Sequence, residues 1–264
     1  MNLTIGYIPY LNMVPFHQGF GPEPIRDGDL SIRFQKLSPR QLGVEAEAGQ
    51  IDAGAMSLVD TFRLSEQFEP LGNFGIGVKQ TAHSVLLFSK KPLAELDGMC
   101  AVTDETATSV RLLQVLLEKR YNRTAVNFGR VAAEMYDGSA EALLLIGDEA
   151  LRAQRVGIKG FPVVTDLAAE WYAWWKNPFV FARWVVRKDL PELYKSMLTD
   201  YLEKSLDTTY SKIIDLANSN HSRVGLSSEE LANYWFGFDY KLLPLHMHTI
   251  KMFKDLLEPV CLTA

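Results

Sequence analysis

Two long extended segments constrain the fold more than any other feature of this sequence. They are "TAHSVLLFSKK", residues 81–91, and "PFVFARWVVRK", residues 178–188. Between them, and again before the first one, short apolar runs alternate with helical patterns. That alternation is typical of α/β folds with a parallel sheet. We therefore expect the two segments to lead into and out of a second α/β unit that is inserted into the first.

This order of segments predicts two lobes. Lobe one would combine residues 1–87 with residues 182–264, and residues 88–181 would form the inserted lobe two. The helices expected after residue 190 would pack back on lobe one. This layout is that of a two-lobed binding protein with a cleft at the hinge, a class of protein that closes around a ligand.

Composition and charge exclude several classes of function. The chain has 264 residues, of which 47% are hydrophobic and 22% charged, with a net charge of −5. Since no long basic run is present, we expect neither a nucleic-acid partner nor a basic arm. No apolar stretch reaches the length of a membrane span, and the N-terminus lacks the features of a secretory signal, so we expect a cytoplasmic protein. The two cysteines, Cys100 and Cys261, are expected to be free thiols.

The most informative local feature is a set of hydroxyl side chains at predicted helix starts. A helix N-terminus offers unpaired N–H groups and a partial positive charge, which suit a carboxylate or a phosphate. For Ser38 and Ser57 the simpler interpretation is an N-cap. In "TDETATS", residues 103–109, there are more hydroxyls than capping needs, so contact with a ligand is favoured. The candidates for anion binding are therefore Ser38, Ser57, Thr106, Thr108 and Ser109.

Other candidates are less specific. Asp148 follows a predicted buried strand at a helix start, where it would either cap the helix or face a ligand. His246 and His248 form an H-x-H pair, but no further ligands complete a metal site, so none is predicted. His83 and Ser84 are neighbours on a predicted strand and would point to opposite faces, so they cannot act as a base and nucleophile.

Five ordered segments together resemble a known family. They are "IGYIPYLNMVPF", "HSVLLFSKKPLAELDG", "VTDETATSVRLLQVLL", "ALLLIGDEAL" and "NPFVFARWVVRKDLP", and they run from the N-terminus to about Pro191. In this order they are similar to the MqnA family of menaquinone biosynthesis, the chorismate dehydratases of the futalosine pathway. The resemblance implies a type II periplasmic-binding-protein fold used as a cytoplasmic enzyme. It implies a small-molecule substrate, chorismate, with no metal or organic cofactor and no obligatory protein partner.

The resemblance also implies an active site. The Asn of "YLN" corresponds to Asn12 and the Ser before "VLLFS" to Ser84, and both are expected to contact the reacting substrate. The hydroxyls at 106–109 are expected to hold a carboxylate, with Ser38 and Ser57 at equivalent starts in lobe one. No dedicated protein base is implied, because the substrate's own enolpyruvyl carboxylate would take the proton.

Two departures and two alternatives accompany this resemblance. Met56 stands where the family often has a serine, and His83 stands where a small residue is expected. One alternative is the related naphthoate synthase of the same pathway, whose expected histidine has no clear counterpart here. The other is a binding protein for a small carboxylate without enzymatic activity, because a fold alone does not specify a function.

Overall fold

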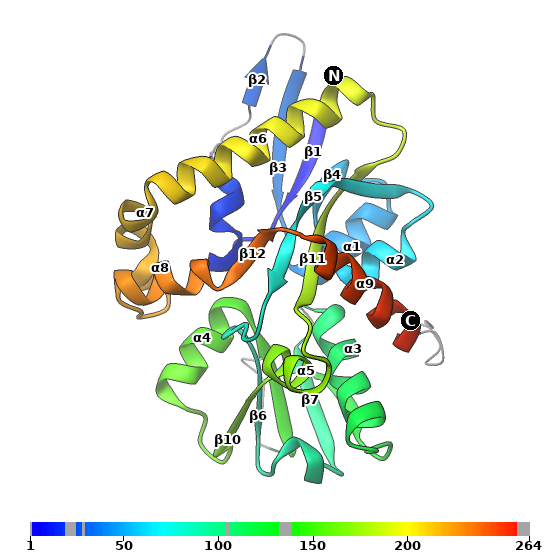
Figure 1. Cartoon of the computed structure of the whole chain (residues 1–264), viewed down its shortest axis with the longest axis vertical. Helices are drawn as coiled ribbons and strands as arrows, with labels where there is room; N and C mark the ends of the chain where they lie inside the picture. Colours follow the sequence, from blue (N-terminus) through cyan, green and yellow to red (C-terminus); the bar gives the residue numbers. More distant parts are fainter. Residues whose placement is uncertain (1, 19–24, 28–29, 104–105, 132–138, 258–264) are drawn as a thin grey trace. The chain divides into compact units, whose positions relative to one another are not determined.

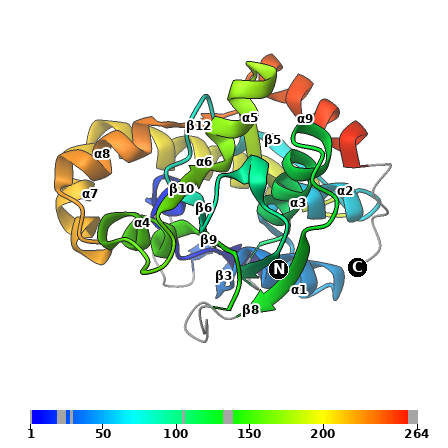
Figure 2. The same ribbon diagram turned by 90° about the horizontal axis from the view of Figure 1, so that it is seen from below.

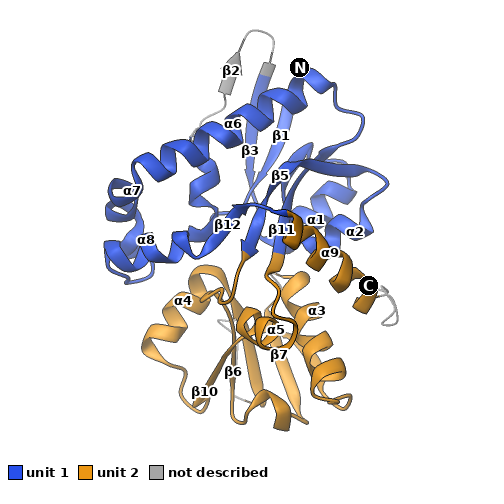
Figure 3. Ribbon diagram, in the orientation of Figure 1, with its two compact units in different colours: residues 1–77, 181–243 blue, residues 78–180, 244–264 orange. Residues whose placement is uncertain are grey.

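The computed structural model describes residues 2–18, 25–27, 30–103, 106–131 and 139–257. Tertiary contacts divide the chain into two compact units, shown in Figure 3: unit 1 comprises residues 1–77 and 181–243, and unit 2 comprises residues 78–180 and 244–264. Each unit contains one sheet with helices packed on it (Figure 1). The predicted two-lobed α/β organisation is therefore confirmed.

Unit 1 is built on a seven-stranded sheet in the order β12-β5-β11-β4-β1-β3-β2. The strands are β1 (Asn2–Tyr7), β2 (Ile25–Asp27), β3 (Leu30–Lys36), β4 (Ala53–Ser57), β5 (Phe68–Val78), β11 (Phe179–Arg187) and β12 (Phe238–Lys241). β1 is parallel to both β3 and β4, whereas β11 is antiparallel to β4 and β2 is antiparallel to β3. The carboxyl ends of the three parallel strands therefore lie at one edge of the sheet.

Helices cover both faces of this sheet. They are η1 (Leu11–His17), α1 (Pro39–Glu47), α2 (Leu58–Arg63), α6 (Glu192–Ser211), α7 (Ile213–Asn220), η5 (His221–Arg223) and α8 (Ser228–Phe236). α6 lies on the opposite side of the sheet from α1 (Figures 1 and 2). On the α1 face, a Cβ atom at Gly6 would lie 2.6 Å from the Leu42 side chain, so glycine lets the helix approach the strand.

The other face of this sheet carries an aromatic core. Phe16, from η1, makes edge contacts with Phe74, Trp184 and Tyr240, at ring-centroid distances of 6.3, 5.6 and 5.2 Å. All four rings are buried. Such pairs add about 0.5–1.5 kcal/mol each beyond the area that they bury. The segment that follows β1 is thereby fixed against three strands of the sheet.

Unit 2 is built on a five-stranded sheet in the order β10-β6-β9-β7-β8. Its elements are β6 (Val85–Ser89), η2 (Leu93–Glu95), β7 (Met99–Thr103), α3 (Thr108–Val115), η3 (Leu116–Arg120), β8 (Asn127–Val131), β9 (Ala142–Ile146), α4 (Gly147–Val156), β10 (Val163–Asp166), α5 (Leu167–Trp175) and α9 (Pro244–Leu257). β7 is parallel to β8 and β9, while β6 is antiparallel to β9 and to β10.

The C-terminal helix α9 belongs to unit 2, which differs from the assignment of residues 182–264 to lobe one. The physical reason is an aromatic cluster. Phe253 of α9 lies 5.9 Å from Trp171 and 5.0 Å from Phe179, measured between ring centroids. All three rings are buried. α9 also lies beside α3, as Figure 2 shows.

The boundary between the units also differs from the sequence prediction. The chain first leaves unit 1 after Gly77, ten residues before the predicted end of that part of lobe one at residue 87. The long strand here is β5, and the predicted extended segment 81–91 contains only the five-residue strand β6. The second extended segment is confirmed as β11. The helices expected after residue 190 begin with α6 and α7, which are separated at Lys212.

Candidate functional site

Three of the predicted site residues follow the parallel strands of unit 1. Asn12 lies in η1 after β1, Ser38 follows β3, and Ser57 ends β4. The registers pair Gly6 with both Gln35 and Gly54, so these strands end at the same edge. Ligands of open α/β sheets bind beyond such carboxyl ends. The structure therefore brings these three residues to the edge of unit 1 where a ligand is expected.

The hydroxyl groups of Ser38 and Ser57 both cap helices. The Gln41 N–H donates to Ser38 Oγ at 3.2 Å, and the Ser38 N–H donates to Gln41 Oε1 at 2.9 Å, which forms a capping box. The Asp60 N–H donates to Ser57 Oγ at 3.3 Å, and Ser57 Oγ donates to Asp60 Oδ2 at 2.7 Å. The capping interpretation is confirmed for both serines, and their contact with a substrate stays a prediction.

Asn12 differs from the two serines because its side chain has an open acceptor. Its Oδ1 atom is buried and has no hydrogen-bond partner within the described part of the chain. Buried polar atoms are almost always hydrogen-bonded, and a bare one costs about 1–3 kcal/mol. Such an atom is placed to accept a hydrogen bond from a bound molecule.

His17 is a buried polar residue that the sequence analysis missed. Its ring lies 4.5 Å from the Tyr7 ring and 6.2 Å from the Trp184 ring, between centroids. Neither ring nitrogen has a partner among the described residues, and the same holds for Trp184 Nε1. Burial lowers the pKa of His17 to about 3, so the imidazole is neutral at pH 7. The signal in the sequence was its place in the segment after β1, shared with Asn12.

Arg183 is a second residue that the sequence analysis missed. It lies on β11 opposite Met56 of β4, one position from the end of that strand. Its Nε atom is buried and has no partner among the residues described. Burial lowers the pKa of the guanidinium. The signal in the sequence was a single arginine inside the apolar run "FVFARWVV".

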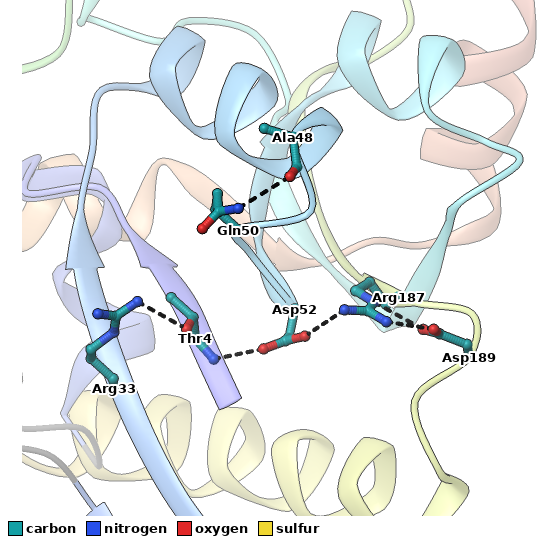
Figure 4. Close-up of polar contacts among 7 residues, drawn as sticks. All are labelled: Thr4, Arg33, Ala48, Gln50, Asp52, Arg187 and Asp189. Atoms are coloured by element: carbon teal, nitrogen blue, oxygen red, sulfur yellow. Dashed lines mark hydrogen bonds and ion pairs between the residues drawn. The ribbon is translucent and has the colours of Figure 1, made fainter. Parts of the chain in front are cut away.

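The other arginine of β11 is paired. Arg187, at the far end of the strand, contacts Asp52 at 3.2 Å and also contacts Asp189 (Figure 4). Asp52 Oδ2 accepts a hydrogen bond from the Thr4 N–H at 2.8 Å. A hollow of about 370 Å³ lies at this end of the sheet, lined in part by Phe68, Arg187 and Asp189. The hollow contains none of the predicted site residues.

Unit 2 brings Ser84 and Asp148 together. β6 and β9 pair antiparallel with Val85 opposite Ile146, and the Gly147 N–H donates to the Ser84 carbonyl oxygen at 2.8 Å. Ser84 is buried, and its hydroxyl donates to the Ala82 carbonyl oxygen at 3.2 Å. Asp148 is the second residue of α4, so the proposal that it is the N-cap is wrong, because Ile146 occupies that position.

The segment before Ser84 is held by Asp166. Asp166 Oδ2 accepts from the N–H groups of Ala82 and His83, at 2.9 and 2.7 Å. Its Oδ1 atom accepts from the first turn of α5. Burial raises the pKa of Asp166, and the backbone donors oppose that rise. His83 has a φ of 57°, and its ring forms a hydrogen bond with Thr81 Oγ1 at 3.0 Å.

The hydroxyl cluster lies at the start of α3, as predicted, and its side chains are buried, while their contact with a ligand stays a prediction. The Ser109 N–H donates to Thr106 Oγ1 at 3.3 Å, and Thr106 Oγ1 donates to Ser109 Oγ at 3.2 Å. Thr106 Oγ1 therefore accepts a hydrogen bond from a backbone N–H in the first turn of α3. Thr108 is 1% exposed. Thr103 ends β7, and its Oγ1 atom is buried without a partner in the residues that the structure describes.

The cluster and the Ser84–Asp148 pair share one edge of the unit 2 sheet. β7 and β9 are parallel, so the hydroxyl cluster after β7 and Asp148 after β9 follow carboxyl ends at the same edge. β6 begins at this edge, because it runs antiparallel to β9. The five predicted site residues of this unit, Ser84, Thr106, Thr108, Ser109 and Asp148, thus lie along one edge.

Metal ligands are not grouped in the described parts of the chain. Within 2–18, 25–27, 30–103, 106–131 and 139–257, no group of three or more His, Cys, Asp or Glu side chains could hold a metal ion. His246 is buried in α9. Cys100 is a free, buried thiol, and Cys261 lies outside the described residues. Of the helices described, none has the length and apolar character needed to cross a membrane.

Comparison with solved structures identifies the fold. Protein AF1704 from Archaeoglobus fulgidus superposes with a TM-score of 0.78 at 15% identity, covering 98% of this chain and 97% of that one. The periplasmic aliphatic sulphonate binding protein SsuA from Escherichia coli superposes with a TM-score of 0.66 at 14% identity, covering 98% and 92%. The fold is that of periplasmic binding proteins, as expected.

Comparison with known sequences identifies the family. The chorismate dehydratase of Thermus thermophilus is 28% identical over 260 residues, covering 90% of this chain and 89% of that protein. The chorismate dehydratase of Campylobacter jejuni is 26% identical over 210 residues, covering 79% and 78%. A family model described as menaquinone biosynthesis matches residues 3–259. Because this match spans nearly the whole chain, the protein belongs to the menaquinone biosynthesis family.

Proposed function

We propose that the protein is a chorismate dehydratase, a hydro-lyase that converts chorismate to 3-[(1-carboxyvinyl)oxy]benzoate and water. The observation that carries this proposal is the match to the Thermus thermophilus chorismate dehydratase, which covers 90% of this chain and 89% of that protein. The reaction would serve the futalosine route to menaquinone in the cytoplasm.

The chemistry needs orientation more than activation. The ring hydrogen beside the enolpyruvyl ether leaves as a proton, and the electrons of that bond complete an aromatic ring as the neighbouring hydroxyl departs. Proton and hydroxide together make the water that is lost. Because aromatisation drives the reaction, the protein need only hold the dianionic substrate and assist proton transfer.

The buried polar groups of the two units suit this task. In the proposal, Asn12 holds the departing hydroxyl or a carboxylate, which its unpartnered Oδ1 and its amide N–H groups allow. Ser84 contacts a carboxylate or a hydroxyl, and the hydroxyls at the start of α3 hold a carboxylate at a helix N-terminus. The enolpyruvyl carboxylate of the substrate takes the proton. No metal or organic cofactor and no obligatory protein partner enters this proposal.

Two alternatives are less well supported. The related naphthoate synthase is disfavoured because both relatives described above are chorismate dehydratases. A binding protein without enzymatic activity is compatible with the fold, but the similarity to SsuA at 14% identity shows only the fold. Turnover separates these alternatives from the dehydratase.

The test is incubation of the purified protein with chorismate. We expect a rising aromatic absorbance and a product that is lighter than chorismate by one water in mass spectrometry. Spontaneous breakdown of chorismate gives either an isomer of unchanged mass or loss of the whole pyruvyl side chain, so mass separates the enzymatic product. Heat-denatured protein is the control. Unchanged chorismate, together with tight binding of another carboxylate, would overturn the proposal.

A further inference from the structure

Near the carboxyl edge of the unit 1 sheet lies an arginine, Arg183, that forms no ion pair with an acidic side chain of the described residues. Arg183 lies opposite Met56 in the β11–β4 ladder, and Ala182 lies opposite Ser57. Ser57 ends β4, so Arg183 is one register position from the edge where the parallel strands end. This is the edge that also positions Asn12. A cation is therefore held close to the predicted binding residues of this unit.

The charge of Arg183 has no counter-charge within the described residues. Its side chain is half-buried, its Nε atom is buried without a hydrogen bond, and no ion pair among the described residues includes it. By contrast, Arg63 pairs with Glu47 and Asp60, and Arg187 pairs with Asp52 and Asp189. Burying even part of a guanidinium without a partner is costly, so buried polar and charged groups are ordinarily paired. Such an arginine calls for an anion from outside the chain.

The two arginines of β11 differ in whether they form ion pairs. Arg183 and Arg187 are four residues apart on β11, so their side chains leave the same face of the strand. Arg187 lies at the amino end of β4, beside Asp52 (Figure 4). Arg183 lies at the carboxyl end of β4, where ligands of such sheets bind. The unpaired arginine is thus the one at the binding edge.

The proposed substrate carries two carboxylates, and the hydroxyls and helix N-termini of the predicted site offer only partial charges. A guanidinium binds a carboxylate through two parallel N–H···O bonds, a geometry that a lysine cannot copy. We propose that Arg183 binds one carboxylate of the substrate and sets the preference of the site for a dianion. This inference rests on the proposed function, since it takes chorismate as the ligand.

The first test compares three variants in steady-state turnover of chorismate. We expect Arg183→Gln to raise KM by about 10- to 100-fold, the range expected when a hydrogen bond to a charged group is lost. Arg183→Lys keeps the positive charge but loses the two parallel N–H donors, so its KM should lie between those of the wild type and Arg183→Gln. Arg187→Gln, on the same strand, is the matched control and should keep KM within about twofold.

Thermal unfolding separates this role from a structural one. Arg183→Gln removes a buried, unpartnered Nε atom and no ion pair with the described residues, so this variant should have an equal or higher Tm than the wild type without ligand. Arg187→Gln removes a cation that is paired with Asp52 and Asp189, so this variant should have a lower Tm than the wild type. A lower Tm for Arg183→Gln with an unchanged KM would show that Arg183 is structural and would overturn the inference.

Two monoacid analogues of the aromatic product identify which carboxylate Arg183 binds. 2-Phenoxyacrylate keeps only the enolpyruvyl carboxylate, and 3-(vinyloxy)benzoate keeps only the ring carboxylate. Calorimetry with both should show that Arg183→Gln weakens one monoacid by at least about tenfold and leaves the other nearly unchanged. Equal binding of both monoacids by the wild type and Arg183→Gln would overturn the inference.

The outcomes also separate the two proposals. If the wild type does not convert chorismate, the proposed function fails, and the monoacid titrations still decide whether Arg183 binds a carboxylate. If the wild type converts chorismate and Arg183→Gln keeps the wild-type KM, the proposed function stands and the inference fails. If the wild type binds neither monoacid and converts nothing, both proposals fail.

Discussion

The backbone N–H of Gly147 donates a hydrogen bond to the carbonyl oxygen of Ser84 at 2.8 Å. This bond joins the residue before β6 to the first residue of α4, and Asp148 follows directly. Gly147 has a φ of 60°, a conformation that costs a glycine little. The main chain thus holds Ser84 in place, and its hydroxyl donates a hydrogen bond of 3.2 Å to the Ala82 carbonyl oxygen, which binding of a substrate would replace.

Ser84→Ala is expected to impair catalysis far more than folding. The change removes the neutral hydrogen bond to the Ala82 carbonyl oxygen, and such a bond is worth about 0.5–1.5 kcal/mol of stability. We expect kcat/KM to fall at least about tenfold, equivalent to about 1.4 kcal/mol of transition-state stabilisation. Ser89→Ala is the matched control, because Ser89 ends the same strand and also donates to a carbonyl two residues away, that of Lys91. Equal activity of the two variants would remove Ser84 from the site.

Asn12→Ala is expected to leave stability nearly unchanged and to reduce kcat/KM at least about tenfold. The physical reason is that Oδ1 makes no hydrogen bond with the described residues, so folding loses none when it is removed. Asn73→Ala is the control, because Asn73 Nδ2 bonds the Leu242 carbonyl oxygen at 3.4 Å in the same unit. Urea unfolding and steady-state turnover measure both quantities. Wild-type turnover by Asn12→Ala would contradict the assignment.

His17 is expected to make the protein sensitive to acid. Its pKa is about 3 in the folded protein and about 6.5 unfolded. Between these values the unfolded chain binds one more proton, so stability falls as pH decreases from 6.5 towards 3. The slope from this residue is about 1.4 kcal/mol per pH unit at most, and the total is of the order of 5 kcal/mol.

His17→Phe tests this linkage. Phenylalanine suits the apolar space between Tyr7 and Trp184, and removing the titrating group should reduce the slope of unfolding free energy against pH by one proton. His248→Gln, a change at an exposed histidine of α9, should keep the wild-type slope. Denaturant unfolding at pH values from 4 to 7 measures the difference. An unchanged slope in His17→Phe would show that folding does not lower the pKa of His17.

Of the hydroxyls at the start of α3, we expect that of Thr106 to stabilise the helix and that of Thr108 to bind the substrate. Thr106→Val removes the acceptor of the Ser109 N–H and should lower stability by about 1 kcal/mol. Thr108→Val keeps the volume of the side chain, and we expect a raised KM for chorismate with a smaller loss of stability than in Thr106→Val. Tm and KM of the two variants give the comparison. The reverse order of effects would assign the cap to Thr108.

The α/β class and the edge positions of the site were predictable because they follow from local patterns. Ser38, Pro39 and Gly49 predict the start and end of α1, and the structure confirms them, with Gly49 at a φ of 72°. Similarly, a buried apolar run followed by a helical pattern predicts β9 and α4. Because helices begin where parallel strands end, these patterns also predict the edges that position the hydroxyls.

The parts that could not be predicted depend on contacts distant in sequence. α9 joins unit 2 because Phe253 packs on Trp171 and Phe179, about seventy to eighty residues away, and its own amphipathic pattern does not specify a partner. Arg183 was missed for the same reason. That none of the described residues forms an ion pair with it becomes visible only when the strands are assembled.

The return of α9 to unit 2 has a consequence for biosynthesis. A ribosome synthesises residues 78–180 before residues 244–257. Until α9 is made, the faces of Trp171 and Phe179 that Phe253 contacts are not covered by this helix. Nascent chains ending near residue 243 would therefore expose buried aromatic surface. Folding of unit 2 therefore depends on α9, so chains truncated before this helix should be retained by chaperones.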